Sequence, residues 1–314
     1  MIGPPFSRRS FLCRTAAAGA GAAIGNLPLT AAVDAIPAAG SARHFCLFTK
    51  HLIGMNPAAL SEHVASLGFH GIEAPIRPGG HVLPERVAEE LPGFVEALGK
   101  TNLRLTILTS GINAIAPEQH TESVLRTAAK LGIKYYRLNW FKYDLKKPLL
   151  PQLDEVRAKM RDLIALSREL GIRPLSQNHN GPGYVGAAIW DLESVMRGFA
   201  PDDWGFAYDI MHATVVGGTS WEIQYRLARP RIGAAYFKDF TWAGKLKPGT
   251  CPLGDGWAAG PEYAKLLKES RFEGPISLHI EYLKAETITN AAEAQLAHAA
   301  GAHDLAKLKE WWGV

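Results

Sequence analysis

Ionisable side chains follow short apolar runs at regular intervals along this chain. Glu281 and Asp209 each close such a run, and their carboxylates can accept a proton or hold a cation. His179 and His212 carry imidazoles that transfer protons near neutral pH, and Lys238 carries a charge that can stabilise an oxyanion. We therefore predict a catalytic group made of Glu281, His179, His212 and Lys238.

The elements that must position these side chains are repeated β-α units, because apolar runs alternate with segments of helical period. The predicted strands are residues 44–48, 71–74, 103–109, 135–139, 173–177, 205–209, 233–238 and 275–281. The predicted helices are residues 57–67, 84–98, 121–131, 153–170, 192–199, 221–227, 262–270 and 291–311. Gly68, Gly132 and Gly171 follow three of these helices, as C-terminal capping glycines do.

Eight such units favour an α/β fold with a single closed (β/α)₈ TIM barrel. A doubly wound open sheet is the competing fold, but no GxGxxG or GxxxxGK[ST] loop follows an early strand. In a barrel the carboxyl ends of all eight strands meet at one face. The polar residues are therefore expected to form one site there.

Several short motifs lie at these strand ends in a fixed order. They are QNHNG at 177–181, YDIMHA at 208–213, KDF at 238–240, LGDG at 253–256 and IEY at 280–282. From about Phe45 to the C-terminus, the chain resembles the sugar phosphate isomerase/epimerase superfamily, the xylose isomerase-like TIM barrels. Relatives commonly have Glu-Asn-His where this chain has Gln177, and Asp-x-x-His where it has Asp209.

The resemblance implies a divalent metal held by a Glu, an Asp, a His and a Glu from the fifth to the eighth strands. Asp209 and Glu281 match this pattern, but Gln177 replaces the first Glu and Tyr236 replaces the His. A set of Gln177, Asp209 and Glu281 would suit Mn²⁺, Mg²⁺ or Ca²⁺, with a histidine such as His279 as a further donor. Two hypotheses stay open, a divalent metal with unusual ligands and a site without metal.

The substitution at 177 also affects the reaction. The family's epimerases use carboxylates on two faces of an enediolate, and an amide cannot replace a base. The sequence therefore predicts a sugar isomerase or epimerase that abstracts a proton alpha to a carbonyl through Glu281, and a 3-keto-glycoside lyase-type elimination is the alternative. The expected substrate is an unphosphorylated sugar or keto-sugar. Its predicted binding residues are Arg77, His81, Asn139, Asn178 and Trp242.

Two other functions share parts of this pattern. A non-catalytic sugar-binding barrel would explain the residues at 177 and 236. An AP endonuclease-like phosphodiesterase would share the Asp-x-x-His and LGDG motifs, but it needs more metal-binding histidines and a basic surface. Outside residues 1–40 the formal charge is only about +2, so no nucleic-acid partner is expected.

The N-terminal residues predict export. Arg8 and Arg9 precede an uncharged run at 15–33, which is typical of a twin-arginine signal peptide over residues 1–40, followed by the barrel over 41–314. Glycines and a proline make this run less apolar than a membrane anchor requires. We expect a periplasmic protein without a stable membrane anchor, with a homo-oligomer possible. Cys13, Cys46 and Cys251 show no disulfide or zinc spacing.

Overall fold

The computed structural model describes residues 44–283 and 287–314, and every structural statement below concerns these residues. The predicted signal peptide at 1–40 lies outside them. Within the described ranges, no helix combines the length and apolar character needed to cross a membrane.

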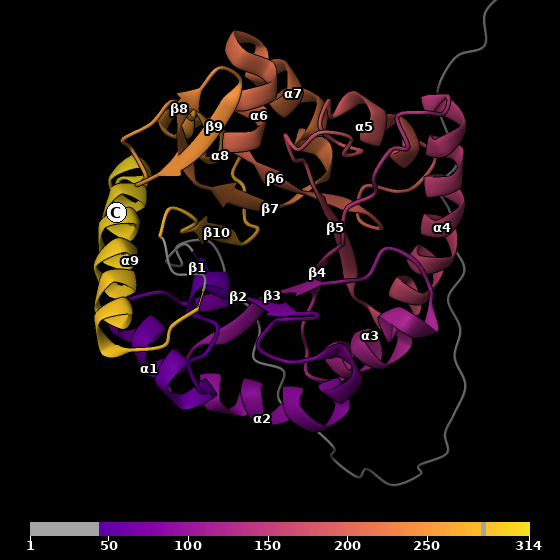
Figure 1. Cartoon of the computed structure of the whole chain (residues 1–314). Coiled ribbons are helices and arrows are strands. Elements are labelled where there is room, and N and C mark those ends of the chain that lie inside the picture. Colours follow the sequence, from indigo (N-terminus) through magenta and orange to yellow (C-terminus); the bar gives the residue numbers. More distant parts are fainter. Residues whose placement is uncertain (1–43, 284–286) are drawn as a thin grey trace, which may run out of the picture. The chain divides into compact units, whose positions relative to one another are not determined.

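In this part of the chain, eight parallel strands close into a barrel, and helices surround it (Figure 1). The neighbour order is β1-β10-β7-β6-β5-β4-β3-β2, with β10 pairing with β1 to complete the ring. The strands are β1 (Phe45–Phe48), β2 (Gly71–Ile76), β3 (Arg104–Ser110), β4 (Tyr135–Arg137), β5 (Arg173–Gln177), β6 (Gly205–Asp209), β7 (Ile232–Phe237) and β10 (Ile276–His279). The predicted (β/α)₈ TIM barrel is confirmed.

The helices cover the outside of the barrel (Figure 1). They are α1 (Pro57–Ser66), α2 (Val87–Gly99), α3 (Thr121–Lys130), α4 (Leu149–Leu170), α5 (Trp190–Met196), α6 (Ile210–Gly217), α7 (Trp221–Ala228), α8 (Gly260–Glu269) and α9 (Ala291–Trp312). Gly68, Gly132 and Gly171 have positive φ angles just after α1, α3 and α4, as their capping role requires.

The eighth barrel strand is shorter than predicted. The sequence suggested residues 275–281, but β10 ends at His279, where its neighbours end too: Phe48 of β1 pairs with His279, and Phe237 of β7 pairs with Leu278. Glu281 therefore lies just beyond the strand, where backbone pairing no longer fixes it. This position suits a residue that meets a substrate.

Two elements were not predicted. Helix α6 begins immediately after β6, because Asp209 acts as its N-cap and accepts from the His212 amide at 3.2 Å. A β-hairpin, β8 (Asp239–Gly244) and β9 (Lys247–Cys251), is inserted after β7. It contacts the last barrel loop, since Thr250 Oγ1 donates to the Glu281 carbonyl at 2.9 Å.

Side-chain alternation along the strands sets the inner layers of the barrel. One buried cluster is apolar: Cys46, Ile107, Leu175, Ala207, Ala234 and Tyr236. Two residues further along β3, β5 and β6 the same inward face carries Thr109, Gln177 and Asp209. Apolar side chains therefore fill one layer of the barrel interior, and polar side chains fill the next layer toward the carboxyl ends of the strands.

Candidate active site

One polar group inside the barrel is the carboxylate of Glu73 on β2, which is fully buried. Among the described residues it accepts hydrogen bonds from Thr109 Oγ1 at 2.5 Å, Ser277 Oγ at 2.7 Å and Tyr236 Oη at 2.8 Å. Two cationic partners adjoin it: His279 Nε2 at 3.1 Å and Arg137 Nε at 3.5 Å. We call these six residues the Glu73 cluster.

The electrostatics of this cluster favour a permanently charged carboxylate. Burial opposes ionisation of Glu73, but His279 and Arg137 outweigh it and hold its pKa at about 2. Burial also opposes a charge on His279, yet Glu73 raises the pKa of that imidazole above its ordinary value. With every acceptor site engaged and no exposure, Glu73 has no free lone pair to offer a substrate.

A second group, nearer the barrel mouth, is built on Asp209. Its Oδ2 accepts from Gln177 Nε2 at 2.8 Å and lies 3.2 Å from Lys238 Nζ. Asn178 fixes the backbone of the same residue: its Oδ1 accepts from the Asp209 amide at 2.7 Å and its Nδ2 donates to the Asp209 carbonyl at 2.9 Å. Asp209 is thus immobilised on both main chain and side chain.

Lys238 joins Asp209 to Glu281. Its ammonium lies 3.3 Å from Glu281 Oε2, and the lysine itself is almost fully buried. Burial disfavours the ammonium, but the carboxylates of Asp209 and Glu281 raise the pKa of Lys238 above its ordinary value. The side chain of Glu281 keeps 27% of its surface exposed, whereas those of Glu73 and Asp209 keep none. With His179 and His212, these three residues form the Lys238 cluster.

The two clusters are connected. Arg137 Nη1 donates to Gln177 Oε1 at 2.7 Å while Gln177 donates to Asp209, so the amide lies between a cation and an anion. On the other side, His279 Nδ1 lies 3.8 Å from Glu281 Oε1. Burial opposes ionisation of Glu281, but Lys238 and His279 hold its pKa well below the usual range. Glu281 is therefore an anion at neutral pH.

His179 has a defined tautomer. The Gly181 amide donates to its Nδ1 at 3.0 Å, so the neutral ring carries its proton on Nε2. Burial and the nearby Lys238 charge lower the pKa of His179 to about 4. Gly181 is required here, because a Cβ at this position would lie 2.0 Å from the Tyr184 ring. His179 can thus donate a hydrogen bond through Nε2, but it cannot accept a proton there.

His212 stacks on His179 with ring centroids 4.0 Å apart. Its Nε2 is 3.6 Å from Asp209 Oδ2, and neither ring nitrogen has a hydrogen-bond partner among the described residues. Burial lowers the pKa of His212 far below its ordinary value, so the ring is neutral. A buried imidazole with free polar atoms can still bind a ligand group or a water molecule.

Two predicted substrate-binding residues are engaged with the protein. Asn178 uses its oxygen and nitrogen on the Asp209 backbone, which makes it a positioning residue. His81 directs Nε2 toward Thr49 Oγ1 at 3.0 Å and packs on Phe94, and burial lowers its pKa to about 4. Sequence reasoning placed both correctly in strand-end loops but could not foresee these internal partners.

Arg77, Asn139 and Trp242 keep accessible surface. The guanidinium of Arg77 has no hydrogen-bond or ion-pair partner within the described ranges, and burial together with repulsion from Arg137 lowers its pKa to about 10. Trp242 is 46% exposed on the β8–β9 hairpin, the same hairpin that contacts the Glu281 backbone. All three remain predicted substrate contacts.

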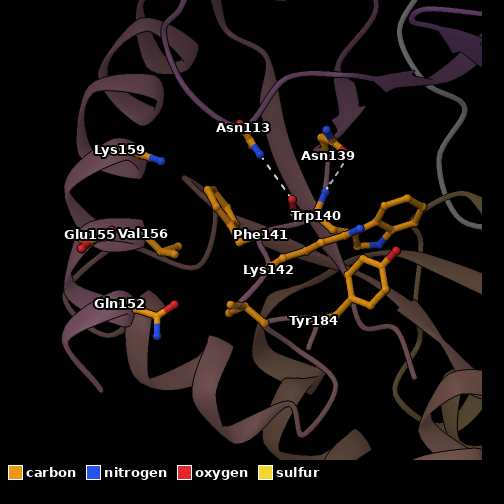
Figure 2. A pocket seen from close by; sticks show the side chains of 11 residues that line it. Asn113, Asn139, Trp140, Phe141, Lys142, Gln152, Glu155, Val156, Lys159 and Tyr184 are labelled. Atoms are coloured by element: carbon orange, nitrogen blue, oxygen red, sulfur yellow. Dashed lines mark hydrogen bonds between the residues drawn. The ribbon is translucent and has the colours of Figure 1, made fainter. Parts of the chain in front are cut away.

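A cavity of about 470 Å³ lies beside these clusters, between α4 and the chain after β4 (Figure 2). Asn113, Asn139, Lys142 and Tyr184 line one side, and Lys159 and Gln152 extend from α4 on the other. Trp140 separates the cavity from the acid-base groups: its ring packs on His179 at 5.0 Å and on Arg137 at 4.9 Å. The cavity therefore adjoins the site, but Glu73, Asp209 and Glu281 do not line it.

The four positions that the family resemblance implies for metal ligands do not suit a metal ion in this chain. The oxygen of Gln177 accepts from Arg137, and the hydroxyl of Tyr236 donates into the Glu73 cluster. Burial raises the pKa of Tyr236 far above its ordinary value, so it stays a neutral phenol. Lys238 lies between the remaining two carboxylates. Across the described residues, no three His, Cys, Asp or Glu side chains are grouped to hold a metal ion.

Sequence reasoning missed the Glu73 cluster as a unit. Arg137 lies in the run YYRL, between buried apolar neighbours, and a charge inside a buried strand usually has a charged partner. Ser277 and Thr109 gave no such signal, because small hydroxyl residues are common in strands. The role of Asp239 in the KDF motif was not foreseen: its carboxylate accepts from the amides of Gly254, Gly256 and Ala258, which orders the LGDG loop.

Comparison with known proteins gives one family match. A sequence model described as "Xylose isomerase-like TIM barrel" matches residues 61–302, well over half of the chain. No curated protein sequence matches significantly.

Several solved structures share the fold. One is 3-keto-D-glucoside 4-epimerase, YcjR, from E. coli, with 15% identity, a TM-score of 0.62, and coverage of 86% of this chain and 100% of that chain. Another is the probable 3-DHS dehydratase AsbF from Bacillus anthracis, with 14% identity, a TM-score of 0.60, and coverage of 85% and 99%. A third is the IOLI protein, described with a binding zinc atom, with 16% identity, a TM-score of 0.67, and coverage of 86% and 98%.

Proposed function

Because the chain belongs to the xylose isomerase-like TIM barrel family, whose structural neighbours are mostly enzymes, we propose that it is an enzyme acting on an unphosphorylated sugar or keto-sugar. In the proposed reaction Glu281 abstracts a proton from the carbon beside a carbonyl. The observation that carries this proposal is the accessibility of Glu281. Within the described residues of the two clusters, it is the carboxylate that a substrate can reach.

The first step of the proposed reaction is proton transfer from the substrate to Glu281. Glu281 takes the proton, the C–H electron pair forms a carbon–carbon double bond, and the carbonyl oxygen becomes an oxyanion. Lys238 lies beside Glu281 and can pair with that oxyanion, and His179 can donate to it through Nε2. Negative charge moves from the carboxylate to the oxyanion beside the same ammonium. The ammonium that lowers the pKa of Glu281 therefore also stabilises the oxyanion that the proton transfer produces.

Two outcomes are compatible with one base. If the proton of the α-hydroxyl group moves to the former carbonyl oxygen and Glu281 returns its proton to the former carbonyl carbon, the carbonyl has shifted by one carbon, and Glu281 is a carboxylate again. Alternatively, the oxyanion reforms the carbonyl, and a new double bond forms between the α and β carbons as the bond to a β-substituent breaks. The substituent takes the proton from Glu281 and leaves as an alcohol, which restores the carboxylate. The amide at Gln177 favours these one-base routes over exchange between two carboxylates, because it is held between Arg137 and Asp209 and cannot titrate.

The test is solvent exchange. The full chain would be incubated in D₂O with a panel of aldoses, ketoses and 3-keto-glycosides, and NMR would follow deuterium at the carbon beside the carbonyl. We expect incorporation with at least one compound, and a loss of ~10²–10⁴-fold in Glu281→Gln. Glu96→Gln on α2, an exposed substitution of the same kind, should keep full activity.

The products and the effect of Glu281→Gln distinguish the possible reactions. Product with a rearranged carbonyl identifies an isomerase, and an unsaturated product identifies elimination. Exchange that survives in Glu281→Gln would remove this residue as the base. Ligand binding without exchange in the unmutated chain would instead indicate a non-catalytic sugar-binding barrel.

We also propose that the chain is exported to the periplasm, on the basis of Arg8 and Arg9 before the uncharged run at 15–33. In a bacterial host, fractionation should find the unmutated chain in the periplasm and the Arg8→Lys/Arg9→Lys variant in the cytoplasm. Equal export of both would contradict the proposal.

A further inference from the structure

We propose that the ammonium of Lys238 occupies the position between Asp209 and Glu281 that a divalent metal would take, so that the site works without one. Lys238 Nζ lies 3.2 Å from Asp209 Oδ2 and 3.3 Å from Glu281 Oε2, between the two carboxylates that match the family's ligand pattern. A cation that bound both carboxylates would have to displace this buried ammonium. The inference concerns metal content and does not depend on the proposed reaction.

The two substitutions at the other ligand positions fit this role. The oxygen of Gln177 accepts from Arg137 at 2.7 Å, and its NH₂ group faces Asp209. Reversing the amide would place its NH₂ group against a guanidinium and its oxygen against a carboxylate, so this orientation is fixed. Gln177 therefore presents donor hydrogens, which repel a metal ion, toward the centre of the site.

Tyr236 is withdrawn from the site in the same way. Its hydroxyl donates to Glu73 Oε1 at 2.8 Å, and the ring packs against His279 with centroids 4.3 Å apart. His279 Nε2 lies 3.1 Å from Glu73 Oε2, while its Nδ1 faces Glu281 Oε1 at 3.8 Å and has no hydrogen-bond partner among the described residues. Both neutral substitutions serve the Glu73 cluster.

The first test is metal content. The full chain, purified without chelator and dialysed in turn against Mn²⁺, Mg²⁺, Ca²⁺ and Zn²⁺, should retain far less than one equivalent of any of them by mass spectrometry. Its melting temperature should not rise with added metal. A stoichiometric ion that is lost in Asp209→Asn would overturn the proposal.

The second test converts the site. In Lys238→Ala/Gln177→Glu the ammonium is gone and the third carboxylate is restored, so Mn²⁺ binding should become measurable by electron paramagnetic resonance, starting from none in the unmutated chain. Lys142→Ala/Gln177→Glu is the matched control, since Lys142 lies over the Tyr184 ring outside the Lys238 cluster. A folded conversion variant that gains no Mn²⁺ binding would count against the proposed position of the ammonium. If that variant fails to fold, the metal content of the unmutated chain decides.

Discussion

The Glu73 cluster and the Lys238 cluster contain the same kinds of groups but differ in how completely they are satisfied. Glu73 is fully buried and surrounded by donors from β3, β4, β7 and β10. Glu281 has exposed surface, an ammonium at 3.3 Å and an imidazole at 3.8 Å. A carboxylate with all its acceptor sites engaged stabilises the fold, whereas one with open sites can act on a ligand. Residue type alone does not distinguish these roles.

The largest expected difference between the two clusters is in stability, and Glu73→Gln would reveal it. Removing this charge leaves Arg137 and His279 buried without their partner, so we expect the free energy of unfolding to fall by ~3–5 kcal/mol. Urea unfolding followed by circular dichroism would measure it. Glu281→Gln should cost less, because its side chain is partly exposed and Lys238 keeps Asp209 as a partner. Equal losses of unfolding free energy in the two variants would show that the two clusters contribute equally to stability.

A smaller effect is expected from Tyr236→Phe. This change removes one donor to a charged, fully buried oxygen while keeping the aromatic ring, so it should cost ~1.5–3 kcal/mol of stability. Because Tyr236 belongs to the Glu73 cluster, metal content should stay unchanged. If activity falls while stability is unaffected, Tyr236 belongs functionally with the Lys238 cluster instead.

His179 and Glu73 should lose their contributions to stability in different pH ranges. His179 is neutral in the folded chain, with a pKa of about 4, and protonates near 6.5 when unfolded. Its contribution is therefore full above about pH 6.5 and is lost as the pH falls toward 4. Glu73, with a pKa of about 2, contributes fully above about pH 4.5 and loses that contribution as the pH falls toward 2.

Unfolding free energies measured from pH 7 to pH 3 would separate these ranges. His179→Gln should flatten the curve between about pH 6.5 and 4 by at most ~1.4 kcal/mol per pH unit, and it should leave the lower range unchanged. An identical slope in the variant and the unmutated chain would show that His179 is not held neutral by the fold.

The sequence predicted the barrel more completely than the site. Strand and helix positions follow from apolar periodicity and from capping glycines such as Gly171, which are local signals. The partner of a buried charge is not local: Glu73 and Ser277 are far apart in the chain and meet because β1 links β2 to β10. The ordered loop after the β8–β9 hairpin could not be foreseen either. Asp239 accepts a hydrogen bond from the Gly256 amide, and turn propensity alone does not reveal this contact.

The closure of the barrel has a consequence for synthesis. Lys238 follows β7 and Glu281 follows β10, while the ring is completed only when β10 pairs with β1. A ribosome that has made the first six barrel strands has produced neither residue. The nascent chain thus acquires Glu281, the proposed base, only with the strand that completes the ring, so the proposed chemistry begins only when folding can finish.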